Sequence, residues 1–132
     1  MEPVVESKEG YLKVTNTADR HAFSEVLEGV NMIAGAMDAY GMNFALIDHS
    51  TVNYHLPVTK AFDLVKVFEI NLPDFRGYTI AVLTNEANLE VARFWESICK
   101  RRGFSMRVFL CEGEAMTWLK RQMALAPAVR RA

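Results

Sequence analysis

The sequence predicts an α/β fold: a mixed, mostly parallel sheet of about five strands with four helices, in the order ββαβαβαβα. Two apolar runs, residues 44–47 and 77–83, lack the polar alternation of half-exposed strands. Such runs are typical of parallel strands that are covered on both faces. Segments with helical spacing separate the strands, so crossover connections are required between them. The first residues have the pattern of a hairpin, which adds an antiparallel strand at one side of the sheet.

The first half of the chain supplies the hairpin and one long helix. Strands at residues 3–6 and 11–15 flank a short turn that ends in glycine. Apolar residues then recur at helical spacing over residues 23–40. Asp19 is the predicted N-cap of this helix, and Gly41 is its predicted C-terminal stop.

The second half supplies three more helices. The second helix is predicted to begin at Pro57, because proline is favoured in a first helical turn. The third helix follows the apolar run 77–83 and ends at Gly103. Residues 104–110 alternate between apolar and polar side chains, which predicts a less covered strand near a sheet edge. The last helix is predicted over residues 112–123.

Length and composition limit the class of protein. With 132 residues, 51% of them hydrophobic and a formal net charge of −1, the chain fits one globular domain. We expect that domain over residues 1–125 and a disordered or loosely attached tail over 126–132. No apolar run approaches the ~18–20 residues of a transmembrane helix. The 15 basic and 16 acidic residues argue against nucleic-acid binding. Only two cysteines and no signal-peptide pattern predict a cytoplasmic protein.

Polar residues follow the predicted parallel strands, at the edge where open α/β sheets collect ligands. The second helix has no acidic residue in its first turn. An anionic group would therefore be favoured at its N-terminus, near Thr59 and Lys60, unless these two side chains are simply solvated. The candidate residues for binding a partner or ligand are Asp48, Ser50, Tyr54, His55, Thr59, Lys60, Thr84 and Asn85.

Enzymatic chemistry at this edge has little support in the pattern. Asp48 could orient His49 or His55, and the imidazole could deprotonate Ser50. Adjacent strand residues point to opposite faces, however, and no Gly-x-Ser-x-Gly motif is present. We interpret Asp48 and Ser50 as residues that satisfy backbone donors where the strand turns into a loop. Cys111, at another strand end, is a less favoured candidate nucleophile.

Metal and cofactor sites are not predicted by spacing. His21, His49 and His55 lack the i,i+4 spacing of helical ligands, and the two cysteines form no Cys-x-x-Cys pair. Glycine-rich phosphate motifs are absent. We therefore expect no catalytic residue, no metal and no cofactor, and we expect that the protein is not an enzyme.

Two segments resemble the STAS domain of anti-sigma-factor antagonists, which has the SpoIIAA-like fold. Residues 44–52, Phe-Ala-Leu-Ile-Asp-His-Ser-Thr-Val, are similar to that family's apolar strand followed by Asp-x-Ser-x-Val. Residues 107–119, Arg-Val-Phe-Leu-Cys-Glu-Gly-Glu-Ala-Met-Thr-Trp-Leu, resemble the ending of an uncharacterised bacterial STAS/SEC14-type branch. The order of elements also matches, over about residues 3–121.

The resemblance implies a non-enzymatic module that docks a protein partner through the N-terminus of its second helix. In phospho-regulated antagonists a serine opens that helix and accepts phosphate. Here Pro57 occupies its place, so the usual phosphoacceptor is missing and Thr59 is the nearest hydroxyl. The alternative is a small-molecule or lipid-binding domain, with an apolar pocket between the second and third helices and an anion site near Lys60. The exposed strand edge and basic tail would also fit a homodimer.

Overall fold

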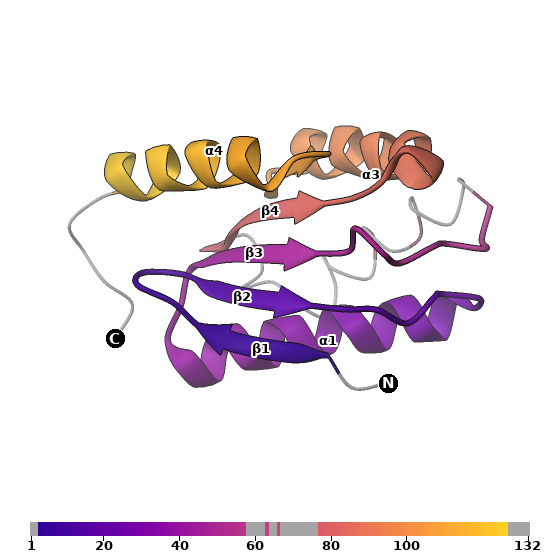
Figure 1. The fold of residues 1–132 in the computed structure, drawn as a ribbon, viewed down its shortest axis with the longest axis horizontal. Coiled ribbons are helices and arrows are strands. Elements are labelled where there is room, and N and C mark those ends of the chain that lie inside the picture. Colours follow the sequence, from indigo (N-terminus) through magenta and orange to yellow (C-terminus); the bar gives the residue numbers. More distant parts are fainter. Residues whose placement is uncertain (1–2, 58–62, 64–65, 67–76, 127–132) are drawn as a thin grey trace.

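A computed structural model describes residues 3–57, 63, 66 and 77–126. Within these residues the chain forms five strands and three α-helices (Figure 1). The strands are β1 (Val4–Ser7), β2 (Leu12–Thr15), β3 (Phe44–Asp48), β4 (Thr79–Leu83) and β5 (Ser105–Phe109). The helices are α1 (Phe23–Tyr40), α3 (Leu89–Arg101) and α4 (Glu112–Leu125), and a short 3-10 helix, η2 (Glu86–Asn88), leads into α3.

The strands form one sheet in the order β1-β2-β3-β4-β5. β1 runs antiparallel to β2, and the other neighbours run parallel. Leu46 of β3 lies opposite Ala81 of β4, and Ile47 lies opposite Val82. The predicted hairpin strand at one side and the predicted parallel pairing of the two apolar runs are therefore confirmed. The prediction of an edge position for the strand near residues 104–110 is confirmed by β5.

Helices cover both faces of the central strands. On one face, α1 and α3 pack against a large apolar cluster that includes Leu12, Ile47 and Val82. On the other face, α4 buries Leu119 against Leu46 and its neighbours. Leu46 is fully buried and Val82 is 8% exposed. This two-sided burial is the reason that the two runs are apolar throughout instead of alternating.

One helix start differs from the prediction, and another predicted helix lies largely outside the described residues. α1 begins after Ala22, not at Asp19, because the Asp19 carboxylate binds a distant loop and Glu25 takes over the helix start by accepting the backbone N–H of Ala22 at 3.2 Å. The stop at Gly41 is confirmed by its left-handed backbone, with φ of 66°. The predicted second helix, beginning at Pro57, falls almost entirely outside the described residues, so the described order is ββαββαβα with three α-helices, not four.

Candidate functional site

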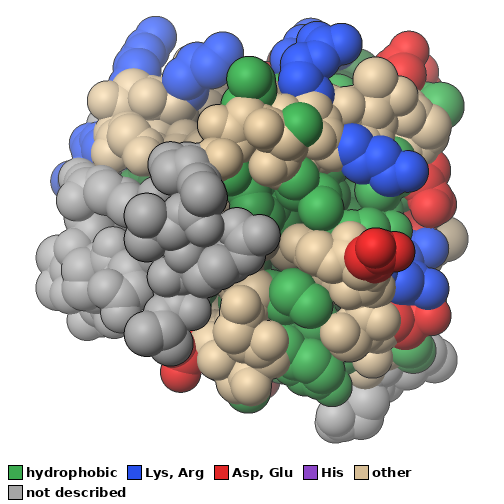
Figure 2. All heavy atoms as spheres, turned by 90° about the vertical axis from the view of Figure 1, so that its left-hand side faces the viewer, with side chains coloured by type: hydrophobic (Ala, Val, Ile, Leu, Met, Phe, Trp, Pro, Cys, Tyr) green, Lys and Arg blue, Asp and Glu red, His purple; other side chains and the backbone are tan. Residues whose placement is uncertain are grey.

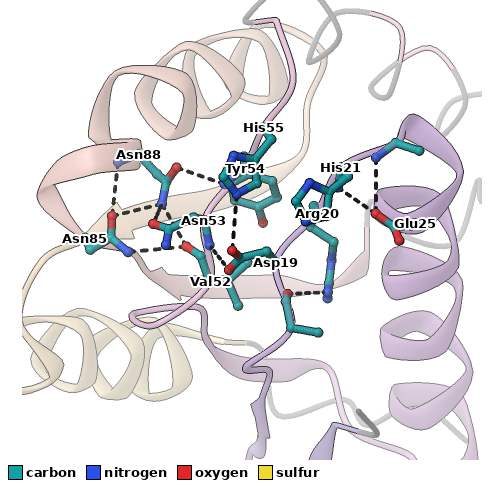
Figure 3. A network of polar contacts seen from close by, with 12 residues as sticks. Asp19, Arg20, His21, Glu25, Val52, Asn53, Tyr54, His55, Asn85 and Asn88 are labelled. Atoms are coloured by element: carbon teal, nitrogen blue, oxygen red, sulfur yellow. Dashed lines mark hydrogen bonds and ion pairs between the residues drawn. The ribbon is translucent and has the colours of Figure 1, made fainter.

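Three loops meet at the carboxyl edge of the sheet, where β2, β3 and β4 end (Figure 3). They are residues 16–22, 49–57 and 84–88. The backbone N–H of Arg20 donates to the carbonyl of Asn53 at 2.9 Å, and the N–H of His55 donates to the carbonyl of Arg20 at 2.8 Å. These two bonds form an isolated parallel bridge between Arg20 and Tyr54. The first two loops are thus joined as a short extension of the sheet.

Two asparagines fix the middle loop to the start of α3. The side-chain amide of Asn88 donates to the carbonyl of Val52 at 2.7 Å, and its oxygen accepts the N–H of Tyr54 at 3.1 Å. Asn85 donates to the carbonyl of Ser50 at 2.9 Å and caps η2 by accepting the N–H of Asn88. Sequence reasoning selected Asn85 but missed Asn88. The pair of asparagines three residues apart, just before a helix, was the available signal.

A buried polar group lies beneath this loop. His49 contacts the side-chain nitrogen of Asn16 through Nε2 at 2.8 Å and the hydroxyl of Tyr54 through Nδ1 at 2.6 Å. Because the amide nitrogen of Asn16 can only donate, Nε2 accepts and Nδ1 carries the proton. Burial, reinforced by the positive charge of Arg20, lowers the pKa of His49 from 6.5 to about 4. Burial raises the pKa of Tyr54 to about 12. Both groups are therefore neutral near pH 7.

Asp48 and Ser50 form a local turn at the end of β3. The Asp48 carboxylate accepts the backbone N–H of Ser50 at 3.0 Å and its hydroxyl at 2.6 Å. This is the backbone-satisfying role that the sequence predicts for Asp48. Within the described residues no imidazole is hydrogen-bonded to Ser50, and His49 and His55 have other partners. The hypothetical serine–histidine pair is thus not assembled in this geometry.

The remaining predicted site residues lie in different environments. Thr84 is buried, with 3% of its surface exposed, and its hydroxyl has no hydrogen-bond partner in the described part of the chain. Cys111 is free and exposed at the start of α4, whereas Cys99 is buried and its pKa is raised to about 12 by burial. Thr59 and Lys60 lie outside the described residues. The predicted anion site at the second helix therefore stays a prediction.

Asp19, His21 and His55 come together on the surface of the same edge (Figure 3). His55 Nε2 lies 3.2 Å from Asp19 Oδ2, and the rings of His21 and His55 stack with centroids 4.4 Å apart. Sequence reasoning selected His55 but missed this cluster, because the spacing test covered only ligands on one helix. The signal that could have found it is that residues 19–21 and 55 follow neighbouring strands of the predicted sheet.

The described cavities are small on the α1 and α3 face. Two apolar cavities of about 40 and 50 Å³ share His49, Tyr54 and Trp95 in their walls. Each has room for a few water molecules, far below the ~300 Å³ of a typical ligand pocket. The apolar pocket predicted between the second and third helices involves residues outside the described ones, so the lipid-binding alternative stays a prediction.

A larger hollow, of about 530 Å³, lies at the opposite edge of the sheet, where the parallel strands begin. Figure 2 shows apolar side chains gathered in the hollowed centre of that face. Met42, Phe44 and Met123 line the hollow, and the described residues around it include no charged side chain. The described part of the chain therefore supplies no charged group there that would orient a ligand.

The arrangement of elements is that of the SpoIIAA-like fold. A solved structure that is similar to this chain is an uncharacterized protein of the DUF3478 family with a SpoIIAA-like fold from Shewanella loihica. Its TM-score is 0.55 at 16% identity, over 89% of this chain and 92% of that one. An anti-sigma factor antagonist from Mycobacterium paratuberculosis is also similar, with a TM-score of 0.59 at 15% identity, over 90% and 93% of the two chains. The predicted SpoIIAA-like fold is thus confirmed.

Comparison at the level of sequence adds no further relative. No protein-family model matches the chain, and no curated protein matches it either. Among the described residues, no helix has both the length and the apolar character that crossing a membrane requires.

Proposed function

We propose that this chain is a non-enzymatic interaction module that binds a protein partner through the carboxyl edge of its sheet. The observation that carries the proposal is the loop at residues 49–57, which the side chains of Asn85 and Asn88 hold in one conformation. A loop that is already ordered loses little entropy when a partner binds it. Thr51, His55 and Pro57 are exposed on this loop and are available to a partner.

The likeness to an anti-sigma factor antagonist supports a partner of the anti-sigma-factor type. The contact would extend from the 49–57 loop to the start of the predicted second helix, at Thr59 and Lys60. Pro57 stands where the resemblance places the phosphoacceptor, so docking would not be switched by phosphate there. Free cysteines at positions 99 and 111 favour the reducing cytoplasm as the place of this contact.

The polar groups of the edge support a role other than catalysis. The Ser50 hydroxyl donates to a carboxylate, and the nearest buried imidazole, His49, is already bonded at both nitrogens. A general base needs a free lone pair within reach of its nucleophile. An electrophilic probe at neutral pH should therefore leave Ser50 unlabelled, and efficient labelling of Ser50 would contradict this part of the proposal.

The docking proposal is tested by direct binding. The purified chain is titrated with each anti-sigma-factor-type protein that its source genome encodes, by calorimetry. We expect one of them to bind, and we expect Thr51→Arg and Lys60→Glu to weaken that binding at least ~10-fold, as loss of interface contacts does. Lys120→Glu, an exposed charge reversal on α4, is the matched control and should bind as the wild type does. Equal binding by all three variants would overturn the proposed surface.

A further inference from the structure

The surface cluster of Asp19, His21 and His55 has the chemistry of a transition-metal site. Each residue offers one ligand atom, and these atoms all lie within 4.8 Å of one another. Two imidazoles and one carboxylate are a ligand set that suits Zn²⁺ and its neighbours in the first transition row. A single carboxylate with two imidazoles does not suit Mg²⁺ or Ca²⁺, which take oxygen ligands.

The separations are close to those of bound ligands. Two ligands at 2.0–2.2 Å from one tetrahedral ion lie roughly 3.4 Å apart. Asp19 Oδ2 and His55 Nε2 are already 3.2 Å apart. The rings of His21 and His55 are stacked and nearly parallel, with an interplanar angle of 3°, and both residues are exposed. The ligand nitrogen of the exposed His21 lies within 4.8 Å of both other ligand atoms, so only a small adjustment of this side chain is needed for a third metal bond.

The backbone that carries the three residues is fixed on both sides. The Arg20–Tyr54 bridge joins the two loops between the ligands. On one side, Asp19 Oδ1 accepts the N–H of Asn53 at 3.0 Å, which leaves Oδ2 free to face His55. On the other, the carboxylate of Glu25 accepts the N–H of His21 at 2.6 Å. The bond from Asn53 to the Asp19 carboxylate is of the kind that orients metal ligands, and the bond to Glu25 fixes the backbone at His21.

Charge at the cluster also suits a cation. The hydrogen bond from the Asn53 backbone and then that from His55 lower the pKa of Asp19, so its carboxylate is ionised near pH 7. Glu25 adds a second negative charge close by, and the guanidinium of Arg20 is turned inward toward the carbonyl of Ala18. The positive charge of Arg20, which lies between Asp19 and His21 in the sequence, is therefore directed away from the three ligand atoms.

We propose that Asp19, His21 and His55 bind one Zn²⁺ ion, or a divalent ion of the same class, at the carboxyl edge of the sheet. The three residues fill three positions of a tetrahedron, and the fourth is open to solvent. This inference does not depend on the proposed docking function, because it concerns metal affinity of the isolated chain.

The test uses the full chain without a histidine tag, freed of metal by a chelator. Calorimetric titration with ZnCl₂ should give one site per chain, and Mg²⁺ should give none. Co²⁺ should bind at the same stoichiometry with the visible absorption of a tetrahedral site. His21→Gln, His55→Gln and Asp19→Asn should each weaken Zn²⁺ binding at least ~10-fold, in line with the loss of a ligand or of its orientation.

Three controls keep the outcome decisive. Glu114→Gln removes an exposed acid elsewhere, and Cys111→Ser removes the exposed thiol; both should bind Zn²⁺ as the wild type does. Thermal unfolding without metal shows whether each variant folds. His21→Gln is the safest of the three because the His21 side chain is exposed and, among the described residues, makes the ring stack on His55 and no hydrogen bond. Zn²⁺ should raise the melting temperature of the wild type and not of His21→Gln. Unchanged affinity in the ligand variants, loss in Cys111→Ser, or only millimolar binding would overturn the proposal.

Discussion

Acidification should destabilise this protein through His49 before its carboxylates are protonated. In the folded chain the imidazole is buried and neutral, and its pKa is lowered from 6.5 to about 4. In the unfolded chain the same group takes up a proton near pH 6.5. Between these two values only the unfolded state is protonated, so stability falls as the pH falls.

The size of the effect follows from the two pKa values. With a pKa of 6.5 unfolded and about 4 folded, the free energy of unfolding should fall by about 2 kcal/mol between about pH 7.5 and about pH 5. The full loss, reached below the folded value, is about 3 kcal/mol at ~1.4 kcal/mol per pH unit. Against a typical domain stability of ~5–15 kcal/mol, such a loss is easily measured.

Urea unfolding at several pH values measures this loss, with chelator present so that no metal contributes. His49→Gln should be less stable than the wild type at neutral pH, because bonds to Asn16 and Tyr54 are weakened. Its stability should fall by less than ~0.5 kcal/mol over the same interval, since glutamine does not titrate. His21→Gln, which removes an exposed imidazole, is the control. A variant His49→Gln with the same pH slope as the wild type would refute the argument.

Four further substitutions test the loops and the core by urea unfolding. Asn88→Ala should cost about 2–4 kcal/mol, because the buried groups that it bonds in the 52–54 loop lose their partner, and a cost below ~1 kcal/mol would contradict the bonding scheme. Gly10→Ala should destabilise by about 1–2 kcal/mol, since its φ is 86° and a Cβ there would meet Met123 at 2.5 Å. Gly35 lies in the middle of α1, where an added Cβ meets no other atom within 4 Å. Gly35→Ala should therefore stabilise the fold by ~0.5–1 kcal/mol, and equal effects at the two glycines would contradict this reasoning. Leu119→Ala should cost about 2–5 kcal/mol because the side chain is fully buried, and a cost below ~1 kcal/mol would mean that α4 packs differently.

The sheet could be predicted because its signals are local. The apolar runs that became β3 and β4 lack polar residues since helices cover both of their faces, and that pattern can be read within five residues. The alternation near β5 likewise reports that one face of an edge strand is less covered. The register, with Ile47 opposite Val82, is a long-range feature that the sequence analysis did not predict.

The site could be predicted only in part, because its contacts join residues far apart in the chain. Asp19 has the residue type of an N-cap, yet its carboxylate binds Asn53, 34 residues away. Asp19 makes this long-range hydrogen bond, which also orders a loop, instead of the local bond of an N-cap. Asn88 and His21 were missed for the same reason: their partners Val52 and His55 lie in a different loop.

The Arg20–Tyr54 bridge explains how one edge carries two different environments. Residues in an extended pair alternate between two faces. Arg20 and Tyr54, which are opposite each other, both turn inward, and Tyr54 joins the buried group around His49. Their neighbours Asp19, His21 and His55 consequently turn outward and share one exposed face. The buried polar group around His49 and the proposed metal-binding cluster on the surface are thus two consequences of a single short register.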